Sequence, residues 1–364
     1  MKKKNKNIFK GVLNGKLTKQ IFKIAKKKKF AIPAINCFNT DSINAALLAA
    51  SKINSPIIIQ FSYGGSIFFS GSLNMINDLN KKATIGAILG AKYVHKVSKY
   101  YNIPIILHTD HCNKKILPWL KNLIQYEKKY FKKKNKSLFS SHMIDLSQEP
   151  IKENIKTCKK YLKKIEKINM LLEVELGCTG GEEDGVNNEN IKNNLLYTNP
   201  KDINYAYQQL KKINSKFILA AAFGNVHGVY QPGKVKLKPK ILKKCQKYVK
   251  DKNKIIKKNP LNFVFHGGSG SKISDIKSSI KYGVVKINFD TDVQWSQWKG
   301  ILKFYKKNKN FLKNQIGNPK GKNQPNKKYY DPRNWIEHSK NSCCKKIKKI
   351  YHCLNAYNII KKYL

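Results

Sequence analysis

The chain has 364 residues, of which 41% are hydrophobic, and carries a formal net charge of +52. This length is enough for a large buried core. The longest apolar runs of the chain, about eight residues, fall well short of the ~20 residues that span a bilayer. The lysines are spread along the whole chain, and no basic helix, RNA-binding aromatic strand or zinc-finger spacing organises them, so we expect neither a membrane nor a specific nucleic-acid partner.

Cysteine use and the N-terminal segment favour an intracellular protein. The eight cysteines form no C-x-x-C pair and no regular framework, which predicts reduced thiols. The first residues, "MKKKNKNIFKGVLNGK", are basic, but lysine and asparagine interrupt every apolar stretch, so we expect no export signal. We therefore predict a cytoplasmic protein.

Eight short apolar or β-branched segments bounded by turn residues follow one another along the chain, and each predicts a strand. They are "FAIPAINC" (30–37), "PIIIQFS" (56–62), "PIILHTDHC" (104–112), "FSSHMIDLS" (139–147), "MLLEVELG" (170–177), "FILAAAFGN" (217–225), "LNFVFHGG" (261–268) and "GVVKINFD" (283–290). Segments with apolar residues at helical spacing separate them, for example 41–54, 84–101 and 149–168.

Alternating strands and helices predict a parallel sheet, and eight such units predict a closed (β/α)8 TIM barrel. A doubly wound open sheet is the main alternative, but the turn "NCFNTDS" after the first strand is not a glycine-rich nucleotide turn. We expect residues 1–364 to form a single domain. Its C-terminal part, roughly 292–364, is expected to be a helical extension.

The chemistry of a TIM barrel lies at the C-terminal ends of its strands, and every predicted strand ends in polar residues. These residues are Asn36, Ser62, Asp110, His111, Asp145, Glu175, His227, His266, Asn288 and Asp290.

Three of the eight histidines, His111, His227 and His266, follow three different strands. Three imidazoles that leave a fourth position open are typical of a catalytic zinc site. Asp145 and Glu175 are expected either to hold a metal in a second, less exposed position or to orient the imidazoles.

The remaining histidines and the neighbour of His111 need separate interpretations. Asp110 and His111 are adjacent, so both can serve one site only if the strand breaks there. His108 is expected inside the barrel. Three more histidines fall on predicted helices and are expected to carry no chemistry: His95, His338 and His352.

The segment "GCTGGEEDG" (177–185) combines four glycines with three acids. Glycine makes a loop mobile, and an acid on such a loop suits a base that is delivered when a lid closes. The acids of this loop are Glu182, Glu183 and Asp184.

The loops after the last two strands, "HGGSGS" and "INFDTD", predict a phosphate site built from backbone N–H groups. Its candidate residues are Gly267, Gly268, Ser269, Asp290 and Thr291. Arg333 is the only arginine among 73 lysines and arginines, and its planar guanidinium suits a second phosphate.

Long motifs of this chain resemble the class II fructose-bisphosphate aldolases of the longer type. The similarity runs from "FAIPAINC" to "YYDPRNW", and the motifs that carry it are "LHTDHC", "LEVELGCTGGEEDGV", "FGNVHGVYQPG", "FVFHGGSGS", "GVVKINFDTDVQW" and "GNPKGKNQPNKKYYDPRNW". The resemblance implies a zinc-dependent, reversible aldol cleavage of fructose 1,6-bisphosphate to dihydroxyacetone phosphate and glyceraldehyde 3-phosphate, a step of glycolysis, in a homodimer.

The resemblance also implies roles for individual residues. The zinc is held by His111, His227 and His266, with an alternative buried metal position at Asp145 and Glu175. Asp110 handles the proton of the C4 hydroxyl, Glu183 or Glu182 exchanges the proton at the enediolate carbon, and Asn288 donates to the developing charge. The resemblance also implies the substrate contacts. Asn36 and Ser62 contact the sugar, and Arg333 of the partner subunit binds one phosphate. The ketose phosphate is bound by Gly228, Gly267 to Ser269 and Asn288 to Thr291, with a monovalent cation (Na⁺ or K⁺) against their carbonyls.

Three alternatives stay open at this point. Lys286, in the last predicted strand, is a candidate for a Schiff-base nucleophile of a metal-free aldolase. Tagatose 1,6-bisphosphate, which differs from fructose 1,6-bisphosphate at C4 only, is an alternative substrate. The charge of +52 leaves a nucleic-acid-binding protein as the alternative from a different class.

Overall fold

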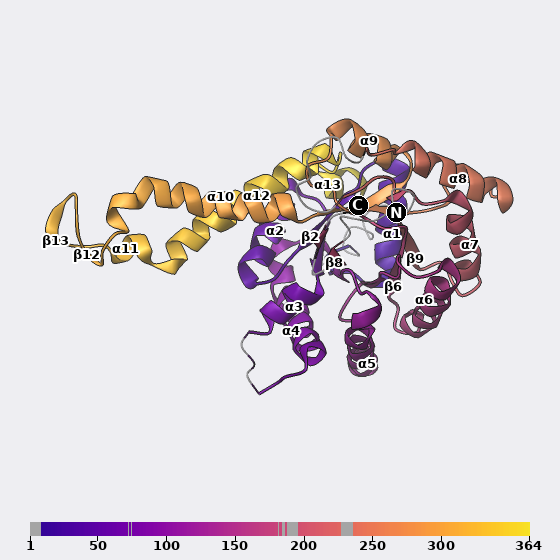
Figure 1. Cartoon of the computed structure of the whole chain (residues 1–364), viewed down its shortest axis with the longest axis horizontal. Helices are drawn as coiled ribbons and strands as arrows, with labels where there is room; N and C mark the ends of the chain where they lie inside the picture. The colour runs from indigo at the N-terminus through magenta and orange to yellow at the C-terminus, as the bar shows by residue number, and fades with distance from the viewer. Residues whose placement is uncertain are drawn as a thin grey trace, which may run out of the picture.

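Eight parallel strands close into a barrel in the computed structural model (Figure 1). The structure describes residues 9–71, 73, 75–180, 196–226 and 236–364, and the backbone of 182–183 and 186–187. The barrel strands are β2 (Ile32–Asn36), β3 (Ile57–Phe61), β4 (Pro104–Thr109), β5 (Ser141–Ile144), β6 (Leu171–Leu176), β9 (Phe217–Ala221), β10 (Phe263–Phe265) and β11 (Val284–Phe289). Their order around the barrel is β4-β3-β2-β11-β10-β9-β6-β5, and the pairing of β5 with β4 closes the ring. The predicted (β/α)8 fold is confirmed, and each predicted strand segment contains one barrel strand.

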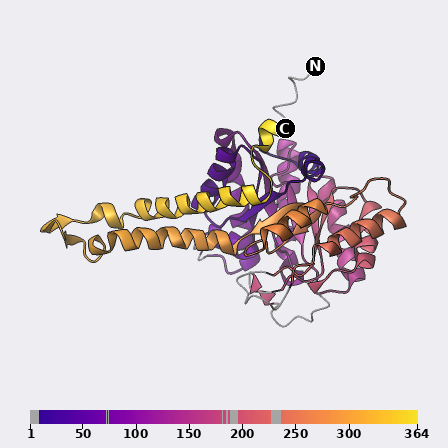
Figure 2. The same cartoon turned by 90° about the horizontal axis from the view of Figure 1, so that it is seen from above.

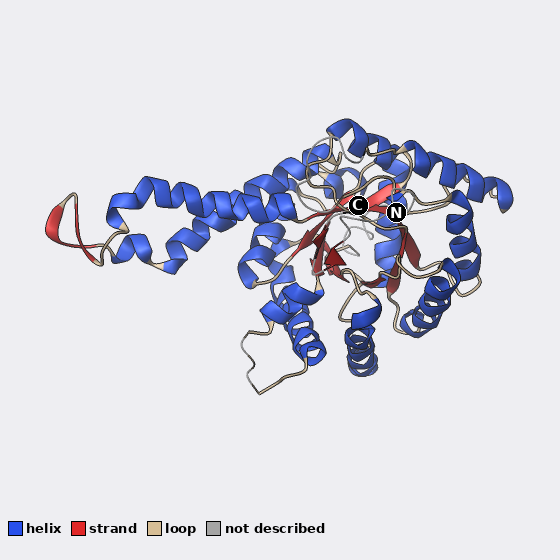
Figure 3. Cartoon of the chain, in the orientation of Figure 1, coloured by secondary structure: helices blue, strands red, loops and turns tan. Residues whose placement is uncertain are grey.

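Helices separate the strands and form an outer layer around them (Figure 3). They are α1 (Gly15–Lys28), α2 (Thr40–Ile53), α3 (Tyr63–Phe69), α4 (Leu79–Tyr101), α5 (Leu117–Lys134), α6 (Ile151–Glu166), α7 (Pro200–Lys211), α8 (Lys240–Lys252) and α9 (Ile273–Lys281), with a 3-10 turn at Lys114–Ile116. No helix of the described ranges is long and apolar enough to cross a membrane.

Local sequence explains where these helices begin and end, as α2 illustrates. Asn39 and Ser42 form a capping box, in which the Asn39 side chain accepts from the Ser42 N–H at 2.8 Å. Asn54 ends the helix in the left-handed conformation (φ 55°), which asparagine adopts more readily than most residues. Between these caps the helix buries a face rich in alanine, leucine and isoleucine against the barrel.

Both ends of the described chain pack on the barrel. The short strand β1 (Gly11–Val12) pairs with the start of β4, which the apolar pattern did not predict because two residues show no periodicity. At the other end, the last turns of α12 (Pro332–Cys353) and the helix α13 (Ile359–Tyr363) lie at the starts of β2 and β3. Tyr351 is fully buried there and donates its hydroxyl to the carbonyl of Pro56 at 2.9 Å.

A long arm projects from the barrel, and it consists of α10 (Thr291–Asn308) and α12 lying side by side (Figures 1 and 2). Gly300 makes the close approach possible, because a Cβ at this position would lie 2.7 Å from the carbonyl oxygen of His338. The outer part of the arm contains a 3-10 turn (Lys309–Phe311), an antiparallel hairpin of β12 (Ile316–Asn318) and β13 (Gly321–Pro325), and α11 (Lys327–Tyr330). The extension expected from the sequence is therefore helical except for this hairpin.

Candidate active site

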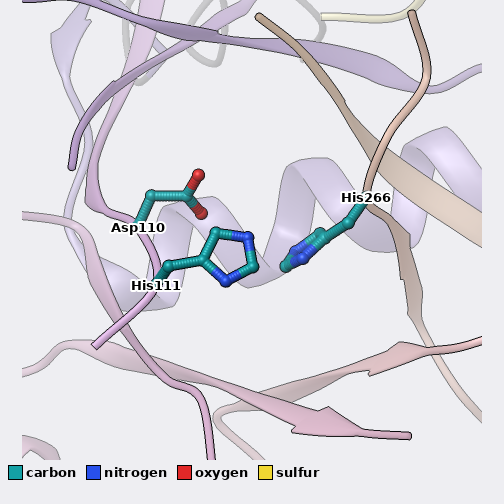
Figure 4. A group of neighbouring side chains, drawn as sticks. All are labelled: Asp110, His111 and His266. Carbon is teal, nitrogen blue, oxygen red and sulfur yellow. The ribbon is translucent and has the colours of Figure 1, made fainter. Parts of the chain in front are cut away.

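Asp110 and His111 both face the C-terminal mouth of the barrel because β4 ends at Thr109 (Figure 4). The Asp110 N–H still bonds to the carbonyl of Phe61 at 2.9 Å, but His111 takes a left-handed conformation with φ 40°. Such a φ is uncommon for histidine and changes the direction of the chain within one residue. Two adjacent side chains thereby reach one site, as the sequence required.

His266 follows β10 and approaches these two residues from the opposite side of the barrel. The ring centroids of His111 and His266 are 4.6 Å apart. Asp110, His111 and His266 each offer one ligand atom, and these atoms lie within 4.8 Å of one another. Two of the three predicted zinc ligands are thus brought together, whereas His227 lies outside the described residues.

Asp145 and Glu175 lie next to the same two imidazoles. Nδ1 of His111 is 3.0 Å from Oδ2 of Asp145 and 3.6 Å from Oε2 of Glu175. That Glu175 oxygen is also 3.3 Å from Nδ1 of His266. His111, Asp145 and Glu175 form a second group whose ligand atoms lie within 4.8 Å, so a second cation position is geometrically available.

Electrostatics at the mouth favour cation binding. Burial alone raises the pKa of Asp145, but the hydrogen bond and the charge of His111, together with hydrogen bonds from Ser147, outweigh it and lower this pKa to about 2. Burial lowers the pKa of His266, but Glu175 and Glu173 outweigh it and raise this pKa to about 9. The carboxylates that raise this pKa would also favour a metal cation beside the ring.

Two carboxamides hold the carboxylate of Asp110, which is fully buried. Nε2 of Gln60 donates to Oδ2 of Asp110 at 2.7 Å, and Nδ2 of Asn288 lies 3.2 Å from the same oxygen. In the part of the chain that the structure describes, the amide oxygens of Asn36, Gln60 and Asn288 have no hydrogen-bond partner. Buried amide oxygens of this kind are ready acceptors for sugar hydroxyl groups.

The loops expected to bind phosphate meet at the N-terminus of α10. Gly267 has φ 67°, and a Cβ there would lie 2.2 Å from the carbonyl oxygen of Val226, so only glycine fits. The N–H of Asp292, in the first turn of α10, donates to Oγ of Ser269 at 3.2 Å. Asp290 occupies the N-cap position of α10, which starts at Thr291. The helix N-terminus and the small residues around it are features of anion sites.

The other predicted residues lie as follows. Asn36 ends β2, and Ser62 follows β3 and caps α3 by accepting from the N–H of Gly65 at 3.1 Å. Glu182 and Glu183 form the short strand β7 (Glu182–Glu183), which pairs with β8 (Val186–Asn187), but their side chains lie outside the described residues, as does Gly228. Arg333 is 87% exposed in the first turn of α12, on the outer part of the arm, and bonds to Asp331 through Nε and Nη2.

Sequence reasoning assigned no role to Glu173 and Gln60, and it treated Lys286 only as a Schiff-base candidate. Nζ of Lys286 forms an ion pair with Glu173 at 2.7 Å, an arrangement that stabilises the ammonium and opposes imine formation. The alternation of side chains along β6 was the available signal, because it places Glu173 on the same inward face as Glu175.

A closed (β/α)8 barrel with imidazoles and carboxylates gathered at its C-terminal mouth defines a metal-dependent barrel enzyme. The profile of the family "Fructose-bisphosphate aldolase class-II" matches residues 16–358. The chain is 60% identical to the class 2 fructose-bisphosphate aldolase of Buchnera aphidicola subsp. Schizaphis graminum over 351 residues, which cover 96% of this chain and 98% of the relative. It is 52% identical to the class 2 fructose-bisphosphate aldolase of Escherichia coli K12, covering 96% and 97% of the two chains.

A crystal structure of fructose-bisphosphate aldolase from Campylobacter jejuni superposes with a TM-score of 0.88 at 50% identity and covers 97% of this chain and 98% of that one. This chain belongs to the class II fructose-bisphosphate aldolase family. The resemblance of its motifs and the prediction of a carbon–carbon lyase are thereby confirmed.

Proposed function

We propose that this protein is a zinc-dependent, homodimeric enzyme of the cytoplasm that cleaves fructose 1,6-bisphosphate reversibly to dihydroxyacetone phosphate and glyceraldehyde 3-phosphate in glycolysis. The observation that supports this best is the meeting of Asp110, His111 and His266 within 4.8 Å. They come from strands on opposite sides of the barrel, so the fold itself builds the site.

The donor set fits zinc. Imidazole nitrogens with carboxylate oxygens nearby are ligands that zinc accepts, and His111, His266 and His227 would hold the ion, with Asp145 and Glu175 as the alternative position. When bound, zinc supplies a Lewis acid for the carbonyl oxygen of the ketose. The proposal includes a monovalent cation, Na⁺ or K⁺, that binds to the backbone carbonyls of the phosphate loops.

Asp110 is the proposed proton acceptor for cleavage. Its carboxylate takes the proton of the C4 hydroxyl, the C3–C4 bond breaks, and the electron pair remains on the ketose fragment as an enediolate. The bond from Asn288 to Asp110 is long, at 3.2 Å, so its N–H can turn to the enediolate oxygen at low cost. Glu183, or Glu182, then returns a proton to the enediolate carbon.

Both ends of the substrate carry a phosphate, and two separate groups of residues are proposed to bind them. Gly228, Gly267 to Ser269 and Asn288 to Thr291 bind the phosphate of the ketose fragment through backbone N–H groups. Asn36 and Ser62 contact the sugar. Arg333 binds the other phosphate from the partner subunit, which agrees with its exposed place on the arm.

Exposed aromatic side chains on the arm support the homodimer. Trp295, Trp298 and Tyr305 of α10 are each about half exposed, with relative exposures of 54%, 52% and 47%. Large apolar side chains clustered on one helix are a feature of protein interfaces. We propose that a second copy of this chain covers these side chains, because Arg333 on the same arm is proposed to bind substrate in the partner's active site.

A chelator experiment tests the proposal. Activity on fructose 1,6-bisphosphate, measured by coupling the products to a dehydrogenase, is expected to vanish with EDTA and return with zinc, and borohydride plus substrate is expected to leave it unchanged. His111→Asn should remove both zinc and activity, whereas His352→Asn, on an exposed part of α12, should keep both. Activity that survives chelation would refute the proposal. Faster turnover of tagatose 1,6-bisphosphate than of fructose 1,6-bisphosphate in the same assay would identify tagatose 1,6-bisphosphate as the substrate.

A further inference from the structure

A buried ion pair crosses the inside of the barrel just below the mouth. Nζ of Lys286, on β11, donates to Oε2 of Glu173, on β6, at 2.7 Å, and the two side chains are 1% and 0% exposed. Strands β9 and β10 lie between β11 and β6, so the pair spans the lumen instead of linking neighbouring strands. Barrel interiors are usually filled by branched apolar residues, and burying two charges costs desolvation energy. A pair in this place therefore calls for an explanation beyond stability.

Glu173 uses its other oxygen to hold His266. Oε1 of Glu173 lies 2.7 Å from Nε2 of His266, and Nδ1, on the opposite edge of the ring, faces Glu175 and His111 at the mouth. When one ring nitrogen donates to a fixed carboxylate, the ring orientation is set and the other nitrogen is left to bind a metal.

Lys286 also lies near the proposed proton acceptor. Its Nζ is 3.7 Å from Oδ1 of Asp110, so one ammonium stands between the carboxylate that holds His266 and the carboxylate that accepts the substrate proton. His108 lies beside the same two carboxylates, 3.4 Å from Glu173 and 3.8 Å from Asp110. Burial and the charge of Lys286 lower the pKa of His108 to about 3.

We infer that Glu173 and Lys286 are positioning residues for the metal site. Glu173 fixes the ring of His266 so that Nδ1 points into the mouth, and Lys286 anchors Glu173 and neutralises its charge. This inference rests on the proposed role of His266 as a zinc ligand.

The alternative is a purely structural ion pair, and a double-mutant cycle separates the two roles. The variants are Glu173→Gln, Lys286→Met and the double variant. Each single change leaves one buried group without its charge partner and should destabilise the fold, whereas the double change removes both charges and should recover much of the stability. Zinc binding should not recover, because the carboxylate that orients His266 is still missing.

The zinc dissociation constant, measured by competition with a chromogenic chelator, is the deciding readout. It should rise about 10- to 100-fold in Glu173→Gln and stay raised in the double variant. Glu127→Gln, which alters another buried glutamate remote from the mouth, is the matched control and should bind zinc as the parent does.

Two results would overturn the inference: parental zinc affinity in Glu173→Gln, or recovery of zinc affinity together with stability in the double variant. If a single variant does not fold, the zinc affinity of the double variant compared with that of the parent still distinguishes a positioning role from a purely structural one. A parent protein that binds no zinc would instead contradict the proposed function, so the two failures can be told apart.

Discussion

Gln60 donates a hydrogen bond of 2.7 Å to Asp110, and this bond joins the end of β3 to the residue after β4 inside the barrel. Hydrogen bonds to a charged group contribute about 1.5–3 kcal/mol, and this one also fixes the direction of the carboxylate. Gln60→Met keeps the volume but loses the donor, so we expect kcat/KM to fall about 10-fold or more.

A second buried glutamine provides the control for this prediction. Gln246, on α8, bonds to the backbone of Leu261 and Tyr282 away from the mouth. Gln246→Met should lower the free energy of unfolding but leave kcat/KM of the folded enzyme unchanged. Equal kcat/KM for Gln60→Met and the parent would show that Asp110 is held without Gln60.

The barrel and its mouth were largely predictable from sequence, because short apolar segments show where strands run and the fold determines where their ends point. The convergence of His111 and His266 needed only the positions of β4 and β10. The contact of Lys286 with Glu173 was not predictable, since it crosses the lumen between strands that are not neighbours and leaves no periodic signal. The hairpin of β12 and β13 was missed for a similar reason: its two strands are short, mostly polar and largely exposed, so they show no apolar alternation.

Zinc should stabilise the folded protein, because the ligands lie on strands that separate when the barrel unfolds. A ligand that binds only the native state at 100 times its dissociation constant adds about 2.7 kcal/mol. We therefore expect a higher urea midpoint with zinc than with EDTA for the parent and no such difference for His111→Asn. A shift of equal size in both proteins would place the stabilising zinc elsewhere.

Arg333→Lys should reduce catalysis without reducing stability. Its guanidinium is 87% exposed, and lysine cannot reproduce two parallel hydrogen bonds to a phosphate, so we expect a loss of about 2–4 kcal/mol in kcat/KM and an unchanged melting temperature. Lys327→Ala, an exposed cation nearby on α11, is the control and should be silent.

Mixing two inactive proteins shows which subunit supplies Arg333. In a heterodimer of Asp110→Asn and Arg333→Ala subunits, one site receives an intact Asp110 from its own chain and an intact Arg333 from the partner. Activity should therefore appear after the two are unfolded and refolded together. If the mixture stays inactive although heterodimers form, Arg333 serves its own subunit.

Glu127 should make the stability of this protein depend on pH. Glu127 is a buried residue of α5, and its carboxylate accepts from the N–H groups of Leu138 at 2.9 Å and Phe139 at 2.7 Å. Burial raises its pKa from 4.5 to about 7, against the effect of the two N–H groups. Between these pH values the folded chain holds a proton that the unfolded chain has lost, so stability falls as pH rises through this window.

The size of the Glu127 effect follows from the shift. A rise of the pKa from 4.5 to about 7 corresponds to roughly 3 kcal/mol in the free energy of unfolding. This stability is present at low pH and is lost once the pH exceeds about 7. Glu127→Gln cannot titrate, so its free energy of unfolding relative to the parent should increase by about this amount between pH 4.5 and pH 8. Urea titrations of both proteins across this range measure the difference, in which the other titrating groups cancel. Parallel curves would mean that Glu127 keeps its charge in the folded state, held by the two backbone N–H groups.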